Sequence, residues 1–201
     1  GLGVMGWADV LVKMQIPYNS DKALKLAEKI SKFVQEEGVA ESQAIAQVKG
    51  GFPNWDGSLW QQMGRKLQRN ATITTIAPTG SIAMTAGCSY GVEPHFAVAF
   101  YKSAMDGYKL PEINADLMEY LENLNLADNG VVDAVLEHGT VQDVEEIPED
   151  VRAIFMTAHD LTPQDHVKMQ AAWQKYTDNA VSKTINMPSD STVDDVDDAF
   201  M

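Results

Sequence analysis

Several residue types that define protein classes are scarce in this sequence. Its 201 residues include one cysteine, Cys88. A single cysteine excludes an internal disulfide framework, a cysteine-cluster metal site and dithiol redox chemistry within the chain. No apolar run reaches the roughly 18 residues that cross a bilayer, and no basic, apolar signal segment opens the chain. These absences predict a cytoplasmic protein that does not enter a membrane.

Positive charge is also scarce. The chain has 15 Lys and Arg against 29 Asp and Glu, which gives a formal net charge of −14. Because the phosphate backbone of a nucleic acid binds clustered Lys and Arg, this balance excludes a broad DNA- or RNA-binding surface. A small phosphorylated ligand is still compatible, since backbone N–H groups can bind it locally. The acidic run over 190–198 is interpreted as a solvated helix face.

The hydrophobic pattern predicts helices separated by short strands. Residues 21–37 place apolar side chains on one helical face, with Gly38 at the expected end. The other predictions are a short buried helix before Pro17, helices over 112–123, 130–138, 149–156 and 164–180, and strands over 71–76, 95–101 and 182–187. Strands separated by long helical segments are typical of an α/β fold with parallel strands. Three strands are few for a closed barrel, so the chain is expected to be part of a larger domain.

A strand-to-helix turn is the best candidate for a binding site. Residues 73–84 read ITTIAPTGSIAM, in which a β-branched run ends at Pro78 and a helix follows. A helix that begins at the carboxyl end of a parallel strand directs free N–H groups and its positive dipole end outward. Gly80 lets a ligand approach the backbone, and Thr79 and Ser81 add hydroxyl groups. This turn suits a phosphate, but the residues alone favour a plain helix cap by Thr79 or Ser81. It lacks the Lys of a P-loop.

Long strings of the sequence resemble one enzyme family. RNATITTIAPTGSIAMTAGCSYGVEPHFAVAF, at 69–100, is similar to the catalytic barrel of ribonucleotide reductases, above all the adenosylcobalamin-dependent class II enzymes. GLGVMGWADVL at 1–11, GGFPNWDGSLW at 50–60 and FMTAHDLTPQDHVKMQAAWQKYTDNAVSKTINMP at 155–188 agree with it in order. The resemblance implies that residues 1–201 form a single fragment, the C-terminal half of a ten-stranded α/β barrel with parallel strands.

The resemblance also implies a reaction and a set of site residues. Family members reduce ribonucleoside di- or triphosphates to deoxyribonucleotides with a thiyl radical, which class II enzymes generate from adenosylcobalamin. The family turn equivalent to Thr79, Gly80, Ser81 and Ile82 holds the substrate phosphates. Pro78 and Glu93 are candidates for lining the substrate cavity, although Glu93 also suits a local ion pair.

The chain departs from the family at the catalytic groups. The radical cysteine, with its Asn and Glu, and the first redox cysteine would precede Gly1, and the last barrel strand with the reducing cysteines would follow Met201. The position of Cys88 is not a catalytic one in the family. We therefore expect no catalytic residue in this chain and no activity from it alone, and we identify no residue that binds adenosylcobalamin.

Other polar residues have simpler interpretations. His159, Asp160 and His166 are expected to make structural hydrogen bonds rather than to bind a metal ion. Asn179 and Lys183 stand where an inward-facing polar group could contact a nucleotide, but they are expected to satisfy free backbone groups at a helix-to-strand junction.

Two function classes stay open. The chain is either part of a ribonucleotide reductase, where it binds the ribonucleotide and pairs with the missing N-terminal half of the barrel, or a non-catalytic nucleotide- or phosphate-binding module derived from that barrel. A half-barrel exposes apolar surface, so self-association through that face is expected.

Overall fold

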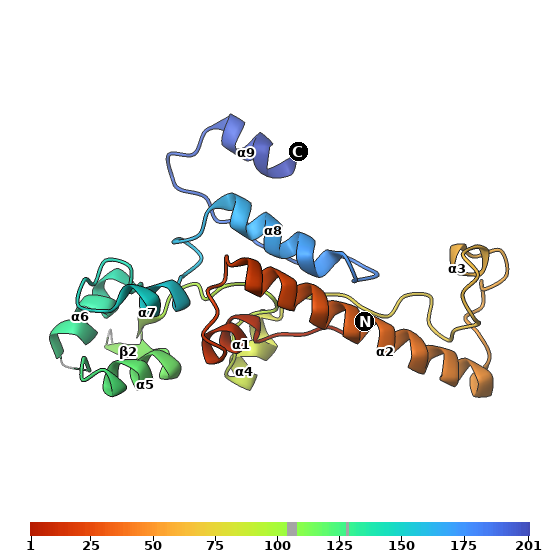
Figure 1. Cartoon of the computed structure of the whole chain (residues 1–201), viewed down its shortest axis with the longest axis horizontal. Coiled ribbons are helices and arrows are strands. Elements are labelled where there is room, and N and C mark those ends of the chain that lie inside the picture. The colour runs from red at the N-terminus through yellow and green to blue at the C-terminus, as the bar shows by residue number, and fades with distance from the viewer. Residues whose placement is uncertain (104–107, 128) are drawn as a thin grey trace.

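The described residues form an elongated assembly of helices with one small hairpin. This computed structural model describes residues 1–103, 108–127 and 129–201. Figure 1 shows one lobe built from α5, α6, α7 and the hairpin, a central body of α1, α2, α4 and α8, and α3 at the far end of α2. The described elements are α1 (Trp7–Lys13), α2 (Asp21–Lys49), α3 (Leu59–Gln62), α4 (Gly80–Ala86), β1 (Ala99–Ser103), β2 (Lys109–Ile113), α5 (Ala115–Asn123), α6 (Asn129–His138), α7 (Glu149–Ile154), α8 (Pro163–Gln174) and α9 (Val193–Phe200).

The longest helix, α2, does not end where the sequence suggested. Its start agrees with expectation, because the Ser20 side chain accepts the Ala23 N–H. The predicted end at Gly38 is wrong, since the helix continues to Lys49. A Cβ atom at Gly38 would lie 2.8 Å from Cγ2 of Ile73. Gly38 therefore allows a close packing contact and does not terminate the helix.

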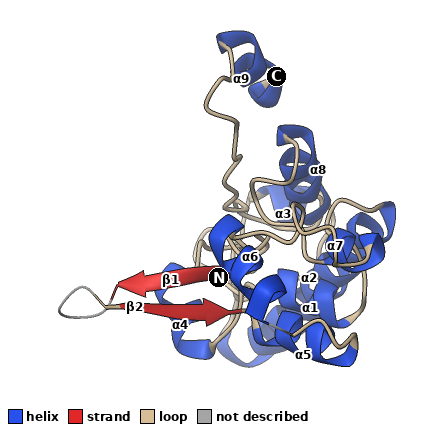
Figure 2. Cartoon of the chain, turned by 90° about the vertical axis from the view of Figure 1, so that its left-hand side faces the viewer, coloured by secondary structure: helices blue, strands red, loops and turns tan. Residues whose placement is uncertain are grey.

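The predicted parallel strands are not continuous strands in the described residues. The described sheet has two strands, β1 and β2, which pair antiparallel from Ala99↔Ile113 to Ser103↔Lys109 (Figure 2). Parallel pairing occurs as isolated bridges, Leu2↔Thr74, Ile76↔Val181 and His95↔Thr157. The predicted strands over 71–76 and 182–187 are thus wrong as regular strands, and that over 95–101 overlaps β1 only at its end. A partial parallel barrel is not confirmed by this sheet.

Side chains interrupt the ladder beside the extended segment 73–76. The Ile73 N–H donates to the Asp178 carboxylate at 2.8 Å, and the Asp178 N–H donates to Thr74 Oγ1 at 2.9 Å. These backbone donors are satisfied by side chains, so they do not extend a strand-to-strand ladder.

Two buried clusters hold the helices together. One joins α1, α2 and α8, where the Trp7 and Trp173 rings meet edge to face with centroids 5.2 Å apart. The other fills the lobe of α5, α6 and α7 around Phe155 and also contains Val12 of α1. Helix α1 therefore packs against both clusters and fixes the central body against the lobe.

Helix α9 follows an extended segment at the C-terminal end and contacts the body at α8 (Figures 1 and 2). Its Val193 and Phe200 side chains are 85% and 80% exposed. Among the described residues, no helix is both long enough and apolar enough to cross a membrane.

Candidate functional site

The turn that the sequence singled out leads from an extended segment into α4. Ile76 pairs with Val181, and Thr79 then adopts a left-handed conformation with φ 57° and ψ 20° as the N-cap of α4. The Thr79 side chain makes no capping bond to the helix. The expected alternative, a plain hydroxyl cap by Thr79, is therefore not what this residue does.

The first residues of α4 face open space. Gly80, Ser81 and Ile82 are exposed, and no atom lies within 4 Å of a Cβ built at Gly80. Their backbone N–H groups belong to the first helical turn, which has no intrahelical acceptor. No hydrogen bond from these three N–H groups to another described residue is found. The turn thus presents three adjacent donors to any anion that approaches it.

The segment 89–93 fixes the back of the turn. Gly91 donates its N–H to Thr79 Oγ1 at 2.7 Å, and Tyr18 donates its hydroxyl to the Val92 carbonyl at 2.6 Å. Gly91 has a φ of +43°, and a Cβ there would lie 3.0 Å from the Ala77 carbonyl oxygen. Burial, and next the charge of Glu93, raise the pKa of Tyr18 well above its ordinary value. Tyr18 therefore remains a neutral donor that anchors this segment.

Glu93 takes part in a largely buried network of polar groups with Lys183, His166 and Thr184. Lys183 donates to Glu93 Oε2 at 2.8 Å, to His166 Nδ1 at 2.6 Å and to the Thr184 carbonyl at 2.7 Å. The Thr184 N–H donates to Glu93 Oε1 at 2.8 Å. The Lys183 side chain is fully buried and that of Glu93 is 16% exposed. Glu93 thus makes the expected local ion pair, and its expected place in the lining of the substrate cavity stays a prediction.

The same network assigns the protonation state of His166. Its Nε2 lies 3.0 Å from the Ala158 carbonyl, so Nε2 carries the proton and Nδ1 accepts from Lys183. Burial and then the Lys183 charge lower the pKa of His166, and burial lowers the pKa of Lys183 although Glu93 opposes it. Each of the three Lys183 protons has an acceptor, so Lys183 has no donor left for a ligand.

The other polar candidates make local contacts. Asp160 accepts hydrogen bonds from the Thr157 N–H and hydroxyl and from the Thr140 hydroxyl, at 2.7 to 2.8 Å. Asn179 donates to Thr72 Oγ1 at 3.2 Å. His159 is exposed and its ring lies edge-on to Phe96. Across the described ranges, no group of three or more His, Cys, Asp or Glu side chains is placed to hold a metal ion.

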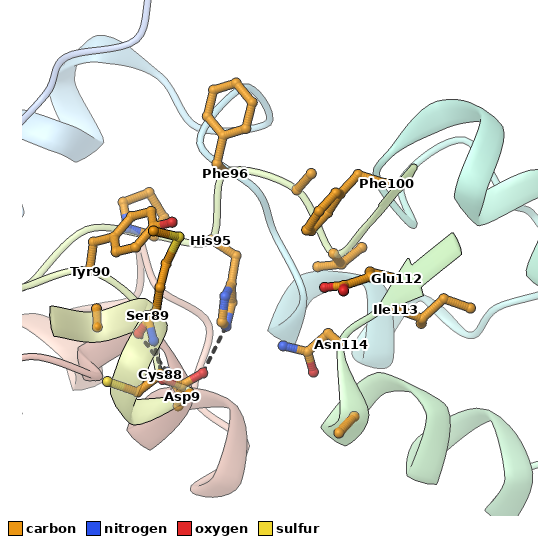
Figure 3. A pocket seen from close by; sticks show the side chains of 17 residues that line it. Asp9, Cys88, Ser89, Tyr90, His95, Phe96, Phe100, Glu112, Ile113 and Asn114 are labelled. Atoms are coloured by element: carbon orange, nitrogen blue, oxygen red, sulfur yellow. Dashed lines mark hydrogen bonds and ion pairs between the residues drawn. The ribbon is translucent and has the colours of Figure 1, made fainter. Parts of the chain in front are cut away.

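A pocket of the described structure lies elsewhere, between α1, α4 and the β1–β2 hairpin. This hairpin pocket has a volume of about 600 Å³. It is lined by Asp9, Ala83, Met84, residues 87–90, Pro94, His95, Phe96, residues 97 and 98, Phe100 and residues 112–115. Figure 3 shows His95 pointing toward Asp9, with Glu112 and Asn114 across the pocket. None of the turn residues 78–82, and not Glu93, lines it.

Sequence reasoning missed the hairpin pocket. Asp9 accepts the Ser89 N–H at 2.6 Å and lies 3.5 Å from His95 Nε2, which joins residues about eighty positions apart. The spacing of residues along the sequence does not predict a contact between such distant positions. His95 follows directly after Glu93 and Pro94, and this is the one feature of the sequence that could have drawn attention to His95 as a site residue. It does not identify Asp9 or Glu112 as its neighbours.

Comparison with known proteins gives a consistent result. The family model described as "Ribonucleotide reductase, barrel domain" matches residues 1–201. A vitamin B12-dependent ribonucleoside-diphosphate reductase of Thermoplasma acidophilum is 48% identical over 200 residues, which is 100% of this chain and 26% of that protein. An enzyme of the same description from Mycobacterium tuberculosis is 38% identical over 98% of this chain and 28% of its own length.

The structural comparison agrees. The alpha subunit of the class Id ribonucleotide reductase of Actinobacillus ureae superposes with a TM-score of 0.72 at 27% identity, over 89% of this chain and 31% of that one. The chain therefore spans about a quarter to a third of the length of each of these proteins.

Proposed function

Because the chain belongs to the ribonucleotide reductase barrel family, we propose that it supplies the substrate-phosphate-binding turn of a vitamin B12-dependent reductase. The observation that carries the proposal is the set of free N–H groups at Gly80, Ser81 and Ile82, which begin a helix within a sequence that matches the family model from end to end. The substrate would be a ribonucleotide, as the names of the relatives indicate.

The role of the turn follows from its electrostatics. A phosphate at the start of α4 would accept hydrogen bonds from the N–H groups of 80–82 and from the exposed Ser81 hydroxyl. The helix dipole adds roughly 0.3–1 kcal/mol for an exposed anion. Pro78 directs the chain away from the extended segment, and the Thr79–Gly91 bond keeps the donors in place. The turn would thereby orient the nucleotide for a reaction at its ribose.

The chemical step would use residues outside this chain. Thiyl-radical reduction needs a radical cysteine and a redox pair, whereas this sequence has Cys88 alone. We therefore propose that the chain is inactive by itself and works within the complete cytoplasmic reductase. Adenosylcobalamin would supply the radical in that enzyme. The described residues include no cluster that would ligate a metal ion, and we assign no residue of this chain to the cofactor.

A substitution at Gly80 in the complete enzyme tests the proposal. Gly80→Glu places a carboxylate where the phosphate would approach, and the site has room for the side chain. We expect the KM for ribonucleotide to rise about tenfold or more, which corresponds to about 1.4 kcal/mol of lost binding. The matched control is Ala86→Glu, which adds the same charge at the exposed other end of α4. An unchanged KM in the Gly80 variant would reject the phosphate role.

Assays of the complete protein also distinguish a reductase from a non-catalytic binding module. Reduction of ribonucleotide by the complete protein supports the reductase. Nucleotide binding at the turn without any reduction, in the presence of adenosylcobalamin and a dithiol, would instead support the non-catalytic module.

A further inference from the structure

The hairpin pocket combines aromatic walls with acceptor groups. Tyr90, Phe96 and Phe100 line it and remain 39%, 66% and 45% exposed, so their rings are available to a ligand. Its volume of about 600 Å³ is in the usual range of small-molecule sites, about 300–1,000 Å³. A planar organic molecule fits such a site better than a hydrated ion.

The charged groups that line the pocket are all acidic. Asp9 and Glu112 contribute carboxylates from facing sides, and no Lys or Arg is among the described lining residues (Figure 3). Glu112 pairs through Oε1 with Lys102 of the neighbouring strand, which leaves Oε2 without a hydrogen bond to the described residues. The pocket therefore repels anions and attracts positive charge.

The neutral polar groups reinforce this preference. Burial lowers the pKa of His95, so the imidazole is uncharged at neutral pH even though Asp9 opposes the shift. The pocket also lies at the C-terminal end of α4, where Ala83, Met84 and Gly87 line it and the helix dipole favours a cation. Aromatic faces add cation–π attraction.

We propose that the hairpin pocket binds a protonated aromatic amine, with the ring against Phe100 and the ammonium group between Asp9 and Glu112. This site does not depend on the proposed phosphate role of the turn, because the two lie at opposite ends of α4 and share no lining residue. A ligand seated there contacts α1, α4 and the hairpin together.

Three probes of matched shape test the charge preference in the complete protein. Tryptamine carries an ammonium group, tryptophol replaces it with a hydroxyl, and indole-3-propionate replaces it with a carboxylate. By isothermal titration, we expect saturable binding of tryptamine, about tenfold weaker binding of tryptophol, and no saturable binding of indole-3-propionate. The tryptamine affinity should fall as salt rises.

Two substitutions assign the binding to this pocket. Glu112→Gln should weaken the binding of tryptamine roughly threefold to tenfold and leave the affinity for tryptophol unchanged. Phe100→Leu should weaken the binding of both tryptamine and tryptophol. The control Glu137→Gln removes an exposed carboxylate from α6, outside the pocket, and should change neither. Glu112 is preferred to Asp9 because Asp9 also holds the Ser89 N–H and its loss risks the fold.

Any of three results would overturn the proposal. These are the absence of saturable tryptamine binding, equal affinity for tryptamine and indole-3-propionate, or a Glu112→Gln variant that binds tryptamine as tightly as the parent protein.

Discussion

At the scale of single residues, the turn depends on a conformation that Thr79 does not favour. A β-branched residue with a φ of 57° is strained, because its Cβ substituents crowd the backbone. The compensation is the bond from the buried Gly91 N–H to Thr79 Oγ1 at 2.7 Å. A hydroxyl at position 79 therefore determines how well the donors of 80–82 are held.

Substitutions at Thr79 distinguish the contribution of its hydroxyl to stability from that of its methyl group. Thr79→Ala leaves the Gly91 N–H buried without an acceptor, so the free energy of unfolding should fall by about 1–3 kcal/mol. Thr79→Ser keeps the acceptor and removes the branched methyl, so its stability should equal or exceed that of the parent. Urea unfolding of both variants measures this. Equal losses in the two variants would show that the hydroxyl bond is not what stabilises the turn.

At the scale of elements, local signals located the helices but did not fix all of their ends. The ends predicted at Gly38 and at 180 are wrong, and so is the start predicted at 112, because residues 112 and 113 belong to β2 and α5 begins at Ala115. The helix predicted over 130–138 is α6, Asn129–His138, and that over 149–156 is α7, Glu149–Ile154, since their periodicity and end signals are local. The helix predicted over 164–180 is α8, which ends earlier, at Gln174.

The sheet was predicted poorly because its partners are remote. Segment 73–76 has the β-branched composition of a strand, yet Asp178, about a hundred residues away, takes the Ile73 N–H that a ladder would use. The candidate site likewise has features that local sequence predicts and features that it does not. The strand–turn–helix pattern predicted the free donors at 80–82, whereas the Glu93–Lys183 pair and the hairpin pocket arise from contacts between distant segments.

The Glu93–Lys183 pair joins two loop segments and, through His166, helix α8, so its loss should be costly. Lys183→Met removes the partner of a largely buried carboxylate and leaves His166 Nδ1 without its donor. Removing one partner of a buried ion pair lowers the free energy of unfolding by about 3–5 kcal/mol. The free energy of unfolding from urea titration should therefore fall by an amount of that order.

The control for this experiment is Lys175→Met. Lys175 also pairs with a glutamate, Glu28, at 2.8 Å, but both side chains are substantially exposed. Its substitution should have a much smaller effect. If the two variants lost equal stability, burial would not be the source of the Lys183 contribution.

At the scale of the whole molecule, two opposing features control association. The net charge of −14 makes copies of the chain repel one another. Large apolar side chains are nevertheless exposed in many places, among them Phe33 at 63%, Ile82 at 58%, Met84 at 69% and Phe200 at 80%. Apolar surface of this extent favours contacts with other protein surfaces.

We therefore predict that the isolated chain self-associates, and more strongly as salt screens the repulsion. The Debye length falls from about 10 Å at 0.1 M salt to about 3 Å at 1 M, whereas apolar attraction does not weaken over that range. Light scattering across this series should show the average mass rising with both salt and protein concentration. Phe200→Glu, which replaces an exposed ring on α9 with a charge, should lower the mass at each salt concentration. A strictly monomeric chain at high concentration in 1 M salt would contradict the prediction, because repulsion would then not be what keeps the copies apart.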